Sequence, residues 1–291
     1  MDGPERNSSI ALLTATALLT AGCAHGGAAA APARPVTAVA GPHGRLSVDD
    51  GGSGGLPVLF VHGNSGNRTQ WKAQLDHLRS SRRAAAFDLH GMGESAPAHD
   101  DTYSVESFAD DVDAVADALG LRRFVLVGHS YGGFVVAAYA GRHPERLAGL
   151  VFADCGGDFS KTPPGELTGL RRGFEPDRFK EFTRVWFEGI LSGGREETKA
   201  AVMQSLRATP REVFVGASLG IYEFPMTEAL ARYRGPRLSI ASILAENPVV
   251  VHKSIPGIPF EVIPGASHWL MMDRPDEFNH ILDGFLGSLP H

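Results

Sequence analysis

The sequence predicts an α/β fold in which helices flank a mostly parallel sheet and a helical segment interrupts the second half. Three observations lead to this prediction. Short runs of consecutive apolar residues are typical of strands buried on both faces, and four such runs lie between residues 58 and 153. Segments with helical periodicity separate the runs, as crossover connections require. From residue 155 to about 235 this alternation stops, and several helix-like segments follow one another.

Composition and charge narrow the classes of partner. The 291 residues carry a net charge of −6 from interspersed charges, without a basic tract. Neither a nucleic acid nor an anionic membrane surface is therefore expected as a partner, and a small-molecule substrate is expected instead. The two cysteines have no zinc spacing and there is no phosphate-binding loop, so no metal and no cofactor is expected.

The first forty residues have the pattern of an exported protein. The apolar stretch Ile10–Leu19 is too short to span a membrane. The segment Thr20-Ala21-Gly22-Cys23-Ala24 resembles the processing box of bacterial lipoproteins. Residues 1–23 are expected to be a signal peptide, with Cys23 as the lipidation site that anchors a protein of the cell envelope. A secreted or periplasmic protein, or a plain N-terminal segment, is the alternative, since Asp2 and Glu5 make the start less positive than usual.

An Ala/Gly/Pro-rich linker is predicted over residues 24–41, followed by a core in two parts, 42–154 and 236–291. The predicted strands before the interruption are Val36–Ala40, Arg45–Val48, Val58–Val61, Ala84–Phe87, Phe124–Val127 and Leu150–Ala153. The predicted helices are Thr69–Leu78, a helix that Ser104 caps and Gly120 ends, and Phe134–Gly141. The last of these is apolar on all sides, which indicates a buried helix.

The segment 155–235, which we call the lid, is predicted to be a helical insertion. Its helices are expected at Asp177–Leu191, Glu196–Leu206 and Thr227–Tyr233, and its aromatic residues are expected to form an apolar wall. The sheet then resumes with Leu238–Ile243 and Phe260–Ile263, and a last helix, Pro275–Leu286, packs on the core.

Ser130 is the predicted nucleophile. It lies within Gly128-His129-Ser130-Tyr131-Gly132, at a turn between a buried strand and a buried helix. The flanking glycines indicate a backbone that is strained and too closely packed for a Cβ, and such a turn pushes the serine toward a ligand. A serine hydroxyl needs a neighbouring base to react at neutral pH.

His268 is the predicted base. It follows the last predicted strand in the loop Gly265-Ala266-Ser267-His268, at the sheet edge where Ser130 also emerges. Among the twelve histidines, no other late one follows a strand in such a loop. His129 is expected to point into the sheet, and His62 is expected to support its own loop.

Four segments, each at the carboxyl end of a predicted strand, make the sequence resemble the α/β-hydrolase superfamily. They are His62-Gly63-Asn64, Asp88-Leu89-His90-Gly91-Met92-Gly93-Glu94-Ser95, Gly128-His129-Ser130-Tyr131-Gly132-Gly133 and Gly265-Ala266-Ser267-His268. They stand in the family's order, and the resemblance covers the chain from about residue 40 to the end. It implies an eight-stranded-type sheet with a lid, and it places the oxyanion-hole amides at Asn64 and Tyr131. Asp88 is assigned to loop architecture.

The acid of the triad is not where relatives usually have it. After Leu238–Ile243 many members carry Gly-x-x-Asp, but here the chain continues Leu244-Ala245-Glu246-Asn247-Pro248 without an Asp. Glu246 would serve if the loop shifts by one residue. Other members, such as certain haloalkane dehalogenases, carry the acid one strand earlier, where this chain has Asp154. We favour Asp154, with Glu246 as the alternative and Asp158 third.

The leading functional prediction is a serine hydrolase that cleaves carboxylic esters of small, largely apolar substrates through an acyl-enzyme on Ser130. The resemblance leaves lactonase, C–C bond hydrolase and cofactor-free haloperoxidase activity open, because these relatives use the same triad. Epoxide hydrolase and dehalogenase chemistry is disfavoured, because those relatives have Asp in place of Ser130. A prediction of another class is a non-catalytic, ligand-binding surface lipoprotein.

Overall fold

The computed structural model describes residues 37–290. The predicted signal peptide and Cys23 lie outside these residues. The predicted strand Val36–Ala40 is present as strand β1 (Thr37–Ala40), whose backbone pairs with β2 (Arg45–Gly51). The sheet therefore begins within residues 24–41, the predicted linker. Within residues 37–290, no helix combines the length and the apolar character needed to cross a bilayer.

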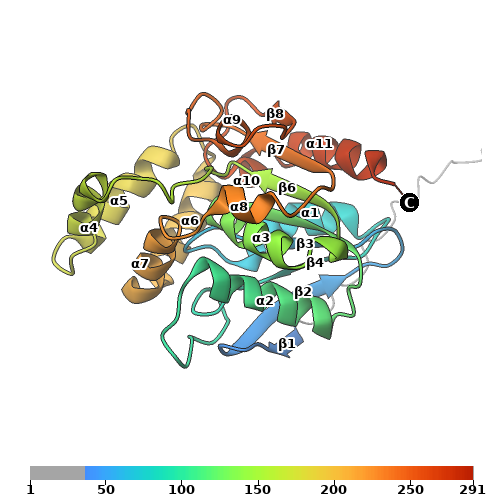
Figure 1. Cartoon of the computed structure of the whole chain (residues 1–291), viewed down its shortest axis with the longest axis horizontal. Helices are drawn as coiled ribbons and strands as arrows, with labels where there is room; N and C mark the ends of the chain where they lie inside the picture. The colour runs from blue at the N-terminus through green and yellow to red at the C-terminus, as the bar shows by residue number, and fades with distance from the viewer. Residues whose placement is uncertain (1–36, 291) are drawn as a thin grey trace, which may run out of the picture. The chain divides into compact units, whose positions relative to one another are not determined.

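An eight-stranded sheet with the order β1-β2-β4-β3-β5-β6-β7-β8 organises the chain (Figure 1). The further strands are β3 (Val58–Val61), β4 (Ala84–Phe87), β5 (Phe124–His129), β6 (Leu147–Ala153), β7 (Arg237–Ala241) and β8 (Phe260–Val262). Strand β2 is antiparallel to both neighbours, and the strands from β4 to β8 are parallel. The predicted mostly parallel sheet is confirmed.

Helices cover both faces of this sheet, with a hydrophobic core on each (Figure 1). Helices α2 (Val105–Ala118), α3 (Tyr131–Arg142) and α8 (Met226–Leu230) contribute to one core, and α1 (Lys72–Leu78), α10 (Leu270–Asp273) and α11 (Pro275–Ser288) to the other. Successive residues of β3 alternate between them, since Leu59 joins the first core and Phe60 the second. The continuous apolar runs of the sequence reflect burial on both faces.

Helix α2 begins where its cap was predicted. The Ser104 hydroxyl accepts a hydrogen bond from the Ser107 amide, and the Ser107 hydroxyl accepts one from the Ser104 amide. Gly120, with a φ of 66°, follows the helix end. Helix α3 starts earlier than Phe134, directly at Tyr131, because the turn before it consists of Ser130 alone.

The lid contains α4 (Thr168–Gly173), α5 (Phe179–Ile190), α6 (Glu196–Ala208), α7 (Arg211–Gly220) and α8. Sequence reasoning missed α4 and α7. The rings of Trp186 and Phe187 on α5 each lie 6.0 Å from that of Phe214 on α7. Aromatic packing therefore joins these two lid helices.

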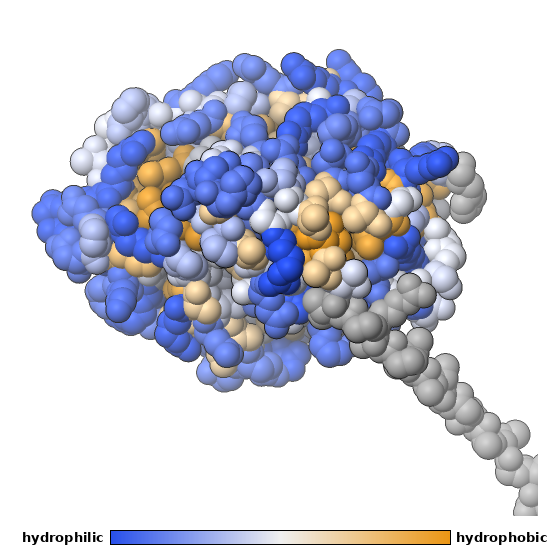
Figure 2. Space-filling model, turned by 90° about the horizontal axis from the view of Figure 1, so that it is seen from below, coloured by the Kyte–Doolittle hydropathy of each residue, from blue (hydrophilic) through white to orange (hydrophobic). Residues whose placement is uncertain are grey.

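The face seen in Figure 2 is mostly hydrophilic, and its hydrophobic residues gather in separate patches. Exposed large hydrophobic side chains of the described residues include Val185 and Trp186 on α5 and Phe260 and Val262 on the edge strand β8. Most other large apolar side chains lie in the two cores.

Candidate active site

Ser130 occupies a strained one-residue turn between β5 and α3. Its φ of 51° and ψ of −118° lie outside the regions that L-residues favour. The turn depends on two glycines. A Cβ on Gly128 would lie 2.3 Å from the Gly132 carbonyl oxygen, and a Cβ on Gly132 would lie 2.6 Å from the His62 carbonyl oxygen. Because Gly128 and Gly132 lack a Cβ, the strand, the turn and the helix can pack closely, and the Ser130 side chain projects from the turn.

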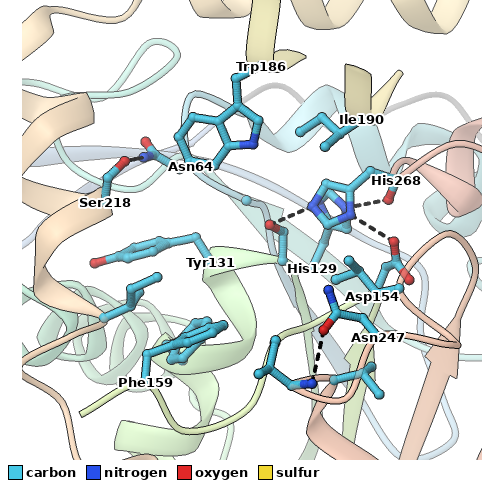
Figure 3. A pocket seen from close by; sticks show the side chains of 18 of the residues that line it. Asn64, His129, Tyr131, Asp154, Phe159, Trp186, Ile190, Ser218, Asn247 and His268 are labelled. Carbon is cyan, nitrogen blue, oxygen red and sulfur yellow. Dashed lines mark hydrogen bonds and ion pairs between the residues drawn. The ribbon is translucent and has the colours of Figure 1, made fainter. Parts of the chain in front are cut away.

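Three side chains that are far apart in the sequence form a hydrogen-bonded chain at the carboxyl ends of the strands (Figure 3). The Ser130 hydroxyl oxygen lies 2.7 Å from His268 Nε2, and His268 Nδ1 lies 2.8 Å from Asp154 Oδ2. Asp154 is fully buried and His268 is 7% exposed. With Nδ1–H donated to the carboxylate, Nε2 is the acceptor for the Ser130 proton.

Asp154 is held by the strand next to its own. The amide of Ser242, the first residue after β7, donates to Asp154 Oδ1 at 2.7 Å. The Ser242 hydroxyl donates to the Ser267 carbonyl at 2.7 Å, beside the base. Sequence reasoning missed Ser242, which directly follows β7, the strand after which many relatives carry their acid. Here the segment after β7 supports the carboxylate of Asp154 instead of supplying one.

The other two candidate acids lie elsewhere. Glu246 is exposed, and its Oε2 lies 3.3 Å from Lys253 Nζ. Asp158 accepts hydrogen bonds from the Ser160 amide, two residues on, and from the Thr227 amide, 69 residues farther along the lid. The alternative that a shifted loop brings Glu246 to His268 is therefore wrong. The turn over residues 242–247 directs the Glu246 side chain outward, away from His268.

The loop after β3 sets the direction of the Asn64 amide. The Gly63 carbonyl accepts hydrogen bonds from His62 Nδ1 at 2.8 Å and from the Gly66 amide at 2.9 Å. Carbonyl and N–H point in opposite directions across a planar trans peptide, so the Asn64 N–H points away from these two donors. The same segment touches the nucleophile, since a Cβ on Gly63 would lie 3.1 Å from Ser130 Cβ.

His62 supports this loop, as predicted. Its Nε2 accepts a hydrogen bond from the Leu89 amide at 3.0 Å while Nδ1 donates to Gly63. Burial lowers the pKa of His62, which favours this neutral tautomer.

The Tyr131 amide, the second predicted oxyanion donor, is the first of helix α3, where N–H groups have no partner within the helix.

His129 has a role that sequence reasoning missed. Its Nε2 donates to the backbone carbonyl of His268 at 2.8 Å. Burial, and next the nearby His268, hold the pKa of His129 well below its usual value, so the ring stays neutral. His129 thus fixes the backbone of the base from inside the sheet.

A cavity of about 240 Å³ opens above Ser130 (Figure 3). Its wall is mainly apolar, and the lid contributes seven large apolar or aromatic side chains to it: Phe159, Trp186, Phe187, Ile190, Phe214, Ile221 and Tyr222. None of the described residues that line it is Lys or Arg. The cavity lies just below the roughly 300–1,000 Å³ that is typical of ligand pockets.

The Asp88 segment is structural, in agreement with its assignment to the loop. Asp88 is fully buried, forms an ion pair with Arg68 and accepts hydrogen bonds from the amides of Arg68 and Glu94. These bonds hold the turn after β4 in place.

Known proteins share this fold and its sequence pattern. A family model described as the alpha/beta hydrolase fold matches residues 57–214. The chain belongs to the α/β-hydrolase family. Among curated relatives, this α/β hydrolase is 35% identical over 262 residues to a 2-hydroxymuconate semialdehyde hydrolase of Pseudomonas sp. (strain CF600), a match that covers 84% of this chain and 91% of the relative.

Two further matches broaden the range of relatives of this α/β hydrolase. It is 28% identical to epoxide hydrolase 3 of Xenopus tropicalis, over 88% of this chain and 81% of the relative. Among solved structures, a thermophilic esterase from Thermogutta terrifontis has a TM-score of 0.73 and 29% identity, over 88% of this chain and 99% of the esterase. The chain is thus an enzyme of a hydrolase family whose members act on different bonds.

Proposed function

We propose that this α/β hydrolase is a serine hydrolase that cleaves carboxylic esters of small, largely apolar substrates. The observation that carries the proposal is the continuous Ser130–His268–Asp154 chain, whose hydroxyl end opens into an apolar cavity. Asp at the position of Ser130 would indicate epoxide hydrolase chemistry, so the serine separates this chain from that activity.

The first half of the reaction forms an acyl-enzyme. Ser130 Oγ attacks the ester carbonyl carbon while His268 Nε2 takes the hydroxyl proton. The negative charge on the former carbonyl oxygen is held by the amides of Asn64 and Tyr131, and one such donor typically accounts for about 10²–10³ in rate. His268 then gives the proton to the leaving alkoxide, the C–O bond breaks, and the alcohol departs.

The second half returns the enzyme to its starting state. Water enters the site of the alcohol and transfers a proton to His268 while its oxygen attacks the acyl carbon. Collapse of the second tetrahedral intermediate breaks the Ser130 ester bond, and His268 returns the proton to Ser130 Oγ. Asp154 stabilises the imidazolium in both halves without taking the proton.

A serine-directed fluorophosphonate probe tests the proposal. We expect Ser130 to be labelled in the wild-type protein and labelling to disappear in Ser130→Ala. p-Nitrophenyl esters of increasing acyl length should be cleaved best when short, because the cavity is small. A folded wild-type protein that neither reacts with the probe nor cleaves any ester would overturn the proposal and favour a ligand-binding protein.

A further inference from the structure

The side chain of Asn64 connects the proposed oxyanion loop to the lid. Its Nδ2 donates to the Phe214 carbonyl at 3.0 Å and to the Ser218 hydroxyl oxygen at 2.9 Å (Figure 3 shows the second bond). Both acceptors belong to α7. They are four residues apart, which places them one turn apart on the same helix face. One amide group therefore bridges two successive turns of a lid helix.

This connection is buried and specific. Ser218 is 5% exposed, and both hydrogens of the Asn64 amide are used by acceptors. Asn64 Oδ1 is buried without a hydrogen-bond partner among the described residues. Among the described residues, the hydrogen bonds of the Asn64 side chain therefore all go to α7.

The adjoining backbone gives the connection a catalytic consequence. The amide N–H of Asn64 is the proposed oxyanion donor, and the next residue, Ser65, has a φ of 58°, an unfavourable conformation for a side-chain-bearing residue. A strained turn persists only where surrounding contacts hold it. The bonds to α7 provide such contacts at the residue that carries the donor.

A second bond of the same kind ties this loop to the lid outside the lining of the cavity. Asn67 Nδ2 donates to the Ser205 hydroxyl of α6 at 2.7 Å. Ser205 does not line the cavity, whereas Asn64 and Ser218 do. The chain therefore offers two matched serine–asparagine bonds between lid and loop, of which one involves the proposed oxyanion donor.

We propose that Ser218 is a positioning residue, which acts through the Asn64 side chain to set the Asn64 amide for the transition state. This inference rests on the proposed function. It implies that the oxyanion hole is complete only when α7 lies against the loop, so that the lid contributes to the rate of the chemical step.

Steady-state kinetics of Ser218→Ala and Ser205→Ala test the inference. For Ser218→Ala we expect kcat on a p-nitrophenyl ester to fall about tenfold with KM within twofold, less than the 10²–10³ for loss of a whole donor. Ser205→Ala should leave both values within twofold. In an Asn64→Ala background, Ser218→Ala should have no further effect, because the residue through which it acts is absent.

Three results would overturn the inference. A rise in KM at unchanged kcat would make Ser218 part of the binding wall alone. Equal losses in both serine variants would reflect general loosening of the lid. Additive effects of Asn64→Ala and Ser218→Ala would show that the two side chains act separately.

Hydrogen exchange separates failure of this inference from failure of the proposed function. We expect the backbone amides of residues 62–67 to exchange faster in Ser218→Ala than in the wild type. Unchanged exchange would refute the positioning role even in a protein without esterase activity. Conversely, suppose that Ser218→Ala exchanges faster than the wild type but the fluorophosphonate probe does not label the wild-type protein. This result would refute the hydrolase proposal and leave the coupling between lid and loop intact.

Discussion

Residues 37–290 contain two buried histidine–aspartate pairs, which differ in the partner of the second ring nitrogen. In the first, His268 Nδ1 lies 2.8 Å from Asp154, and in the second, His90 Nδ1 lies 2.7 Å from Asp111. The Nε2 of His268 faces the Ser130 hydroxyl. The Nε2 of His90 instead donates to the Thr102 backbone carbonyl at 2.8 Å.

The two pairs also differ in their surroundings. His268 borders the cavity, whereas the side chains of His90 and Asp111 are 0% exposed, and the His90 ring stacks on Phe108 with 4.3 Å between centroids. Burial raises the pKa of Asp111. A buried His–Asp pair is therefore not a sign of catalysis by itself. The pair can act as a base when its outer nitrogen faces both a nucleophile and a space for substrate.

The largest expected effect is the loss of the acid from the first pair. Asp154→Asn should lower kcat by about 10⁴ with little change in KM, because an amide cannot hold His268 in the tautomer that accepts the serine proton. Steady-state ester hydrolysis measures this loss, and circular dichroism checks that the variant is folded.

Glu246→Gln is the matched control for Asp154→Asn. It removes the other candidate carboxylate, which is exposed and paired with Lys253, and should leave kcat unchanged. The assignment of the acid would be wrong if Glu246→Gln were the inactive variant and Asp154→Asn kept the wild-type rate.

The second pair should matter for stability instead. Asp111→Ala leaves the His90 ring buried beside an empty acceptor position, and breaking such a buried pair typically costs about 3–5 kcal/mol of the free energy of unfolding. Urea denaturation measures the cost, while kcat of the folded protein should stay near the wild-type value. Asp76→Ala, which removes an exposed pair with Lys72, should cost less than about 1 kcal/mol. A large loss of kcat without a loss of stability would give His90 a functional role.

The residues of the first pair could be predicted from the sequence better than the residues around them. The reason is the distance along the chain between the residues that interact. Ser130 is recognisable because its glycines and its strand–turn–helix pattern lie within a few residues. The choice between Asp154 and Glu246 depends on which strand end faces His268, more than a hundred residues along the chain from Asp154. Ser218 gives no local signal, because its partner Asn64 is 154 residues away and a serine in a short helix is unremarkable.

The smallest expected effect concerns His129, which links the first pair to the core. Because burial depresses the pKa of His129 well below the usual 6.5, the native state keeps this ring neutral where the unfolded chain binds a proton. The free energy of unfolding should therefore fall as pH drops below about 6.5, and His62, whose pKa is also lowered, contributes in the same direction.

His129→Gln removes one of these titrating groups and keeps an amide that can donate to the His268 carbonyl. Between pH 6 and pH 5, the wild type should lose about 1 kcal/mol more than this variant, close to the 1.36 kcal/mol per pH unit of a single proton. Urea denaturation at pH 8, 6 and 5 measures this difference, and the pH 8 values isolate the change in packing. Parallel curves for the two proteins would mean that His129 binds its proton equally in both states, and that the carbonyl of His268 holds a ring that is free to titrate.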